Sequence, residues 1–282
     1  MNYPLLTRGG AGPLLHWAPA NGFPLTTYRP IIDGLANRYR SLTVPPRALW
    51  PDIGQPPDRP GTWWELAEDL VGGLRQHATE PVVAIGHSSG GVASLLATLL
   101  DRSLFRGLVL LDPTILSPRI LDEFRPAKAE GWQVSRHPFA FRARERRSEF
   151  ASYEEAFAFW RDKALFRDWS DDALRLYVEG ILRPLPHRGF TLAWSGAWEA
   201  YYFESVQTEI WSDLSRLDPS LPILAVGGST SDVFGPESTG KFRDLVPWAT
   251  STTVQGGHLF PQSAPEATFR VLEAWLQRTV TR

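Results

Sequence analysis

The amino-acid sequence predicts an α/β protein in which a mostly parallel sheet is flanked by helices and interrupted by an inserted helical segment. Short apolar runs alternate with helical patterns through the first half of the chain, as in successive βα units. Residues 115–214 lack a convincing strand pattern, and this stretch is as long as a small domain. Strand patterns return after it. We therefore expect a core formed by residues 1–114 and 215–282, with a helical lid at 115–214.

The elements of the first half follow in a regular order. We predict strands at 14–18, 41–44, 81–85 and 107–111, and helices at 28–38, 62–77 and 92–101. The segment 45–61 is crowded with prolines and is predicted to be loop. Thr62 with Glu65 has the spacing of a capping box at the start of its helix.

The insertion and the C-terminal segment complete the pattern. Within 115–214, Ser152 with Glu155 forms a second capping box, and Ser170 precedes two aspartates that favour a helix start. Two further strands are predicted at 221–226 and 250–254, and a final amphipathic helix at 265–278. Together these elements predict a sheet domain with a helical insertion.

Composition excludes several classes of function. The formal net charge of −2 gives no electrostatic reason to expect a nucleic acid or an anionic membrane as partner. The chain has no cysteine, which excludes disulfides, thiolate metal sites and cysteine nucleophiles. The first fifteen residues resemble neither a signal peptide nor a membrane span. We expect a cytoplasmic protein that needs no metal and no other cofactor.

The sequence Gly86-His87-Ser88-Ser89-Gly90 lies between a predicted strand and a predicted helix. A G-x-S-x-G motif in this context places its serine on a sharp turn, where small neighbours let the strand and the helix pass close together. The serine Oγ is then exposed at a helix N-terminus, which favours a developing negative charge. Ser88 is therefore the predicted nucleophile.

With this motif the chain resembles the α/β-hydrolase superfamily, in its serine-nucleophile branch with a helical lid. The resemblance implies a catalytic histidine in the loop after the last strand, and Gly256-Gly257-His258 occupies that place. It also implies an acid after a late strand. Asp232 follows the 221–226 strand and is the favoured acid; Asp112, which ends the 107–111 strand, is the alternative.

The resemblance further implies an oxyanion hole formed by two backbone N–H groups. One is assigned to Ser89, the residue after the nucleophile. The family commonly has His-Gly-x after the first of these strands, whereas this chain has Asn21-Gly22-Phe23, so the second donor is assigned to Phe23. An alternative alignment places His16-Trp17 on that motif and makes Ala18 the donor.

Substrate class is indicated by the aromatic residues of the insertion, which are too numerous for helices that meet water on one side. We expect a hydrophobic small-molecule substrate bearing an acyl chain or a ring. The pocket residues predicted from this pattern and from the site are His16, Asn21, Trp160, Trp194, Trp198 and Phe234.

The predicted reaction is hydrolysis of a carboxylic ester, lactone or amide through an acyl-enzyme. An acyltransferase with the same triad and a non-catalytic receptor with the same fold are the alternatives.

Overall fold

The structure is a computed structural model that describes residues 3–59, 61–129 and 138–280. Over this part of the chain, seven strands form one sheet in the order β1-β3-β2-β4-β5-β9-β10. The pairings are parallel except for β1, which lies antiparallel to β3 at one edge. The strands are β1 (Leu6–Arg8), β2 (Leu14–Ala18), β3 (Arg40–Thr43), β4 (Val82–His87), β5 (Phe105–Leu111), β9 (Ile223–Gly228) and β10 (Thr250–Val254).

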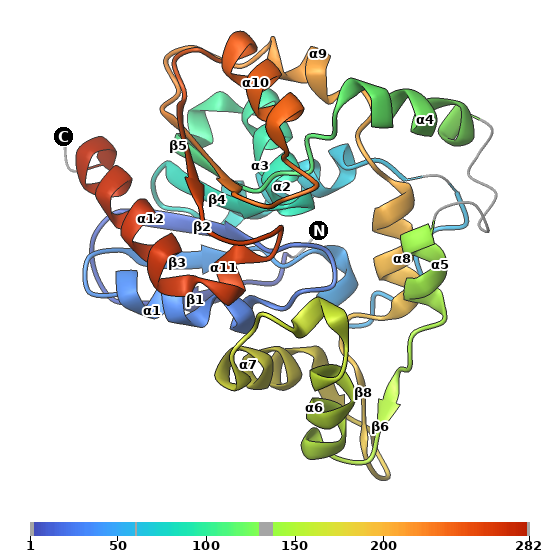
Figure 1. The fold of residues 1–282 in the computed structure, drawn as a ribbon. Helices are drawn as coiled ribbons and strands as arrows, with labels where there is room; N and C mark the ends of the chain where they lie inside the picture. Colours follow the sequence, from blue (N-terminus) through green and yellow to red (C-terminus); the bar gives the residue numbers. More distant parts are fainter. Residues whose placement is uncertain (1–2, 60, 130–137, 281–282) are drawn as a thin grey trace.

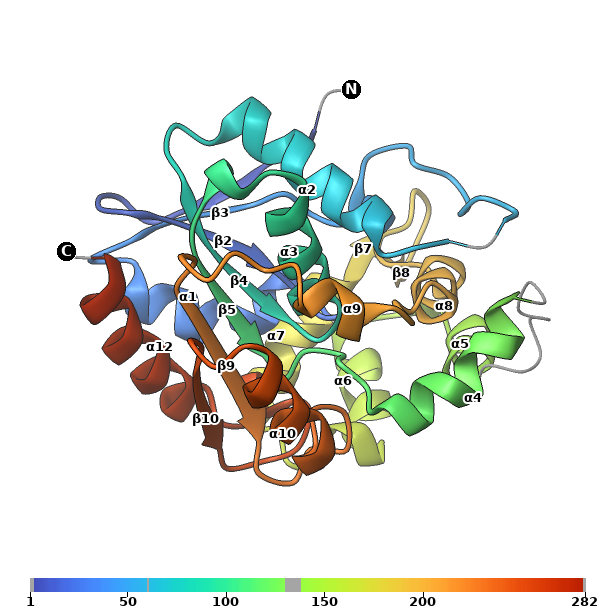
Figure 2. The same ribbon diagram turned by 90° about the horizontal axis from the view of Figure 1, so that it is seen from above.

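Helices cover both faces of this sheet (Figures 1 and 2). Side chains of α2, α3 and α10 pack with one face, whereas those of α1, α11 and α12 pack with the other. The central strands β4 and β5 are apolar along nearly their whole length because both of their faces are buried. The helices are α1 (Arg29–Leu35), α2 (Trp64–His77), α3 (Ser89–Leu100), α10 (Pro236–Leu245), α11 (Phe260–Ser263) and α12 (Pro265–Val280).

The insertion lies on one side of the core (green to orange in Figure 1). It contains α4 (Pro118–Ala129), α5 (Pro138–Arg144), α6 (Tyr153–Arg161), α7 (Asp171–Ile181), α8 (Gly196–Glu204) and α9 (Ile210–Leu214). It also contains strands, contrary to the prediction: β6 (Glu149–Phe150), β7 (Leu182–Pro184) and β8 (Phe190–Leu192) form a small antiparallel sheet. These strands have at most three residues each, too few to show an alternating pattern in the sequence.

The insertion has its own apolar cluster, which runs from Phe150 to Tyr202 and is rich in aromatic rings. Its two ends belong instead to the core, since Leu121 of α4 and Trp211 of α9 pack with the helices α2 and α3. The apolar cluster of the insertion therefore spans a shorter stretch than the predicted lid at 115–214.

Two of the three predicted helix starts are formed as expected. The Ser152 and Ser170 hydroxyls accept the N–H groups of Glu155 and Ala173 at 3.2 and 3.1 Å. Thr62 instead lies one residue further from its helix, and its hydroxyl accepts the Trp64 N–H at 3.4 Å. Within the described residues, no helix combines the length and apolar composition that crossing a membrane requires.

Candidate active site

Ser88 lies on a sharp turn between β4 and α3, in the left-handed region at φ 57° and ψ −124°. Such a conformation is costly for a residue with a side chain and persists where the surrounding structure imposes it. The glycines of the motif permit the turn. A Cβ at Gly86 would lie 2.4 Å from the Gly90 carbonyl oxygen, and a Cβ at Gly90 would lie 2.3 Å from the Ala18 carbonyl oxygen. The turn presents the Ser88 side chain beyond the end of the sheet.

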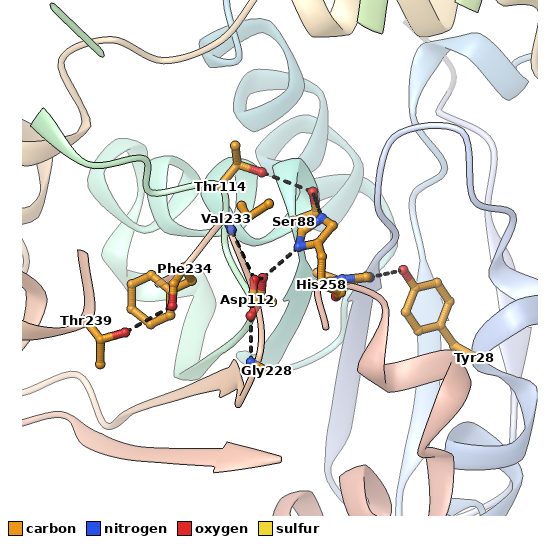
Figure 3. Close-up of polar contacts among 11 residues, drawn as sticks. Tyr28, Ser88, Asp112, Thr114, Gly228, Val233, Phe234, Thr239 and His258 are labelled. Atoms are coloured by element: carbon orange, nitrogen blue, oxygen red, sulfur yellow. Dashed lines mark hydrogen bonds and ion pairs between the residues drawn. The ribbon is translucent and has the colours of Figure 1, made fainter. Parts of the chain in front are cut away.

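His258 reaches this serine from the loop after β10, and its Nε2 lies 3.0 Å from Ser88 Oγ (Figure 3). The loop begins at Gly256, whose φ of +132° favours glycine. It also passes close to β9, because a Cβ at Gly228 would lie 2.5 Å from the Gly257 carbonyl oxygen. The structure therefore brings together the two side chains that the sequence predicted as nucleophile and base.

The acid beside His258 is Asp112, and the preference for Asp232 was wrong. Asp112 Oδ2 lies 2.7 Å from His258 Nδ1, and the Asp112 side chain is fully buried. Asp112 lies directly after β5, the strand next to β4, whereas the loop after β9 turns Asp232 to the surface. From that loop it is Ser231 that points inward, and its hydroxyl donates to Asp112 Oδ2 at 2.6 Å.

Asp112 is held firmly in this place. Its Oδ1 accepts the Gly228 N–H at 2.7 Å, and its own N–H donates to the Val226 carbonyl at 2.7 Å. Its backbone φ is 39°, so the acid, like the nucleophile, occupies a strained left-handed conformation. The strain and the three side-chain contacts orient the carboxylate toward the imidazole.

Thr114 is a further polar residue at the nucleophile, which the sequence analysis did not single out. Its Oγ1 lies 3.0 Å from Ser88 Oγ, and its N–H donates to the Ser88 carbonyl at 3.3 Å (Figure 3). Its position two residues after Asp112, at the same end of the sheet, was the signal that could have found it. Ser88 Oγ thus has two polar neighbours, His258 and Thr114.

A buried hydrogen-bond chain joins the loops on either side of the site. The Ala20 N–H donates to Tyr28 Oη at 3.0 Å, Tyr28 Oη lies 2.6 Å from His87 Nδ1, and His87 Nε2 lies 3.0 Å from the His258 carbonyl. Because a carbonyl only accepts, His87 Nε2 carries the proton and Tyr28 donates to Nδ1. Burial lowers the pKa of His87 well below its usual value, with the nearby His258 acting in the same direction, so the ring stays neutral. His87 thereby positions the backbone of His258.

The two predicted oxyanion-hole donors, Ser89 and Phe23, differ in whether their N–H groups are already hydrogen-bonded within the protein. Ser89 is the first residue of α3, so its N–H has no acceptor within the helix. The N–H of Phe23 is instead engaged in a turn, where it donates to the Ala20 carbonyl at 3.0 Å. The Ala20 N–H is bound to Tyr28. The remaining amides of this turn belong to Asn21 and Gly22. Ala18, the alternative donor, is the last residue of β2.

Two of the six predicted pocket residues, His16 and Trp194, line a cavity of about 40 Å³ that borders Ser89. Asn21 lies in the turn after β2, and its Nδ2 donates to the Glu199 carbonyl at 2.9 Å. The other three are Trp160 and Trp198, which pack in the aromatic cluster of the insertion, and Phe234, which packs in the core. In the sequence, aromatic residues that pack between helices look the same as aromatic residues that line a ligand pocket.

Burial of His16 makes the stability of the fold depend on pH. Burial lowers the pKa of His16 to about 3. Between this value and the ordinary pKa of about 6.5, the unfolded chain binds a proton at His16 that the folded chain does not bind. The stability that the fold owes to the neutral His16 ring is fully present above about pH 6.5 and is lost as the pH falls toward 3. We expect the free energy of unfolding to be about 2 kcal/mol lower at pH 5 than at pH 7 because of this residue.

Urea unfolding at both pH values measures the effect. His16→Gln should reduce the loss by about 2 kcal/mol, while glutamine can still accept the Val44 N–H that His16 Nε2 accepts at 3.2 Å. His187→Gln, at an exposed position, is the matched control and should keep the loss of the wild type. An identical pH dependence in all three proteins would contradict the assignment.

The described residues contain no group of three or more histidine, aspartate or glutamate side chains arranged to hold a metal ion.

The chain belongs to the alpha/beta hydrolase family, whose model matches residues 9–271. The seven-stranded sheet over the described residues, flanked by helices, is the fold of that family. No curated protein matches the chain in a sequence search.

Several solved hydrolases share the fold. E-2-(acetamidomethylene)succinate hydrolase has a TM-score of 0.78 and is 19% identical, over 97% of this chain and 94% of that one. N-formylmaleamic acid deformylase from Pseudomonas putida S16 has a TM-score of 0.67 and is 20% identical, over 95% of this chain and 94% of that one. The enol-lactonase from Burkholderia xenovorans LB400 has a TM-score of 0.67 and is 13% identical, over 97% and 96% of the two chains. At these identities the likeness shows the fold.

Proposed function

We propose that the protein is a serine hydrolase that cleaves a carboxylic ester, lactone or amide of a hydrophobic small molecule. The observation that carries the proposal is the continuous chain of contacts from Ser88 Oγ through both ring nitrogens of His258 to the buried carboxylate of Asp112. A serine, an imidazole and an acid in this order are what nucleophilic acyl transfer at neutral pH requires.

In the first half of the proposed reaction, Ser88 Oγ attacks the substrate carbonyl carbon while its proton passes to His258 Nε2. The carbonyl π electrons move to oxygen, and the tetrahedral intermediate then expels the leaving group, which takes the proton from His258. Asp112 keeps the His258 proton on Nδ1 and stabilises the imidazolium cation. The product of this half is an acyl group on Ser88.

In the second half, His258 takes a proton from water, and the hydroxide attacks the acyl carbon. Collapse of this second intermediate returns the proton to Ser88 Oγ and releases the acid. The negative oxygen of both intermediates would receive the Ser89 N–H, with the N–H of Asn21 or Gly22 as the second donor. Thr114 Oγ1 can donate to Ser88 Oγ when that atom carries charge.

The insertion supports a hydrophobic substrate, because its aromatic cluster covers the turn at the proposed oxyanion hole. The ring of Phe23 lies 5.9 Å from that of Trp169 and 5.8 Å from that of Tyr177. A site covered in this way excludes water and favours apolar groups. The similar solved structures are named as a hydrolase, a deformylase and an enol-lactonase, which is consistent with a fold that serves several acyl bonds.

Labelling with a fluorophosphonate probe tests the proposal. The wild-type protein should be labelled on Ser88, and Ser88→Ala should lose the label while keeping the urea unfolding curve of a folded protein. Ser103→Ala, at a surface hydroxyl that donates to Asp101 at 2.6 Å, is the control and should label normally.

A folded wild-type protein that never labels and turns over no activated ester would instead be a ligand-binding protein. Product analysis with an added alcohol or amine distinguishes the remaining alternative. At a low concentration of the added nucleophile, a hydrolase forms mainly the free acid, whereas an acyltransferase forms mainly the new ester or amide.

A further inference from the structure

The hydrogen bond between Thr114 and Ser88 has a defined direction. Asp112 Oδ2 lies 2.7 Å from His258 Nδ1 and, as a carboxylate oxygen, can only accept, so the proton of the neutral imidazole is on Nδ1. Nε2 then accepts the single proton of the Ser88 hydroxyl at 3.0 Å. Because that proton is already used, Thr114 is the donor in the 3.0 Å contact between Thr114 Oγ1 and Ser88 Oγ (Figure 3).

Thr114 is bound to the nucleophile through its backbone as well as its side chain. It lies in the segment after β5, where its N–H donates to the Ser88 carbonyl at 3.3 Å. The side chain is half-buried, and Ser88 Oγ is the partner that its hydroxyl has among the described residues. The hydroxyl is therefore held against the oxygen atom that would react.

The four tetrahedral positions around Ser88 Oγ are all accounted for. Cβ occupies one, the proton donated to His258 a second, and the hydrogen bond from Thr114 a third. The remaining lone pair is the one that can attack a carbonyl carbon. Once the acyl carbon occupies this fourth position, the position facing Thr114 is unchanged. Thr114 thus contacts Oγ both when it is the nucleophile and when it is the leaving group.

The strength of this hydrogen bond depends on the state of Ser88. A serine hydroxyl whose proton is drawn toward an imidazole is a good acceptor, whereas an ester oxygen is a poor one, because its lone pair is delocalised into the carbonyl. A contact accelerates a step only if it is stronger in the transition state than in the state before it. Thr114 therefore gains little during attack by the free enzyme and much during departure of Oγ from the acyl-enzyme.

We propose that Thr114 is a catalytic residue of the second half-reaction, in which its hydroxyl stabilises Ser88 Oγ as the leaving group. The inference rests on the proposed function, because it needs an acyl group on Ser88. When the second tetrahedral intermediate collapses, the electrons of its negative oxygen re-form the carbonyl, and the electron pair of the C–Oγ bond moves to Oγ. Oγ takes its proton from His258 Nε2, while Thr114 donates a hydrogen bond and keeps its own proton.

Thr114→Val tests the inference, since it removes the donor and keeps the shape of the side chain. Rapid-quench experiments with enzyme in excess over 4-nitrophenyl pentanoate separate the two halves: 4-nitrophenol reports formation of the acyl-enzyme, and pentanoic acid reports its hydrolysis. In the variant, hydrolysis of the acyl-enzyme should be about tenfold slower, so that the acid lags behind the nitrophenol. Release of nitrophenol should stay within about threefold of the wild type, and so should the rate of fluorophosphonate labelling.

Three further variants complete the comparison. Thr114→Ser keeps the hydroxyl and should hydrolyse the acyl-enzyme within about threefold of the wild-type rate, whereas Thr114→Ala, which lacks it, should behave as Thr114→Val does. Thr98→Val is the matched control, because Thr98 is a buried threonine of α3 whose hydroxyl donates to the Leu95 carbonyl at 2.7 Å. It should keep both rates of the wild type. Urea unfolding curves establish that each variant is folded.

Two results would overturn the inference and leave the proposed hydrolase standing. One is an equal loss in both halves of the reaction in Thr114→Val and Thr114→Ala, which indicates a general disturbance of the site. The other is release of pentanoic acid in these variants at the wild-type rate. If the wild type released neither product and Ser88 were never labelled, the inference and the proposed function would both be overturned.

Discussion

Replacing Asp112 with asparagine is expected to lower kcat/KM for an activated ester about 10⁴-fold. The amide cannot hold the His258 proton on Nδ1 as a carboxylate does, and it offers no charge to stabilise the imidazolium. No rearrangement of the side chain is expected to restore the lost interaction, since Asp112 is fully buried and its two oxygens already accept from Gly228 and Ser231. Steady-state kinetics with 4-nitrophenyl pentanoate measures the loss.

Asp232→Asn is the matched control for this prediction. The sequence alone favoured Asp232, but its side chain is exposed. Its substitution should change kcat/KM less than about twofold. The assignment of the acid would be reversed if Asp232→Asn lost the activity and Asp112→Asn kept it. A loss of folding in Asp112→Asn is excluded by comparing its urea unfolding curve with that of the wild type.

Replacing Arg146 with leucine is expected to lower the free energy of unfolding by about 3 kcal/mol. Arg146 lies in the insertion, where its Nη1 forms an ion pair with Glu199 and its Nη2 lies 3.2 Å from Tyr177 Oη. Burial raises the pKa of Glu199, and Arg146 is the group that opposes this rise. Without Arg146, the Glu199 carboxylate would remain buried with no compensating charge.

The consequence should extend to the proposed oxyanion turn, because Glu199 packs against it. A Cβ at Gly22 would lie 2.9 Å from the Glu199 carboxyl, and the Glu199 carbonyl accepts the Asn21 side chain. Arg147→Leu is the control. Its ion pair with Glu155 is 42% and 40% exposed, and its loss should cost less than about 1 kcal/mol. Urea unfolding measures the free energy of unfolding of both variants. If Arg146→Leu and Arg147→Leu lowered it equally, the buried Arg146 ion pair would contribute no more to stability than the exposed Arg147 pair.

The sequence predicted those parts of the fold and site that depend on local pattern. The 14–18 and 250–254 strands have the predicted bounds, because each is a short run of strand-forming residues between clear turns. Ser88 could be located because a strand, two glycines and a helix must all be present for a serine to adopt its conformation. His258 could be located from its place after the last strand.

The acid could not be chosen in this way. Asp112 and Asp232 both follow parallel strands, so both lie at the same end of the sheet. Which of them contacts His258 depends on the conformation of the two loops. In the loop after β9, Ser231 points into the protein toward Asp112, whereas the next residue, Asp232, is exposed to solvent. The second oxyanion-hole donor could not be predicted for a similar reason. The Phe23 N–H that the sequence suggested is bound to the Ala20 carbonyl, three residues earlier.

By itself, the sequence predicted most strands and helices of the core and the two residues proposed as nucleophile and base, Ser88 and His258. Each of these follows from contacts between neighbours in the chain or from the end of the sheet at which a loop must lie. Tertiary structure alone decided which carboxylate lies beside His258 and which amides of the turn after β2 remain available. The acid depends on which carboxylate is buried against His258, and this is set by packing between segments 146 residues apart. The amides of the turn depend on the exact conformation of one loop, in which the Phe23 N–H turns back to the Ala20 carbonyl.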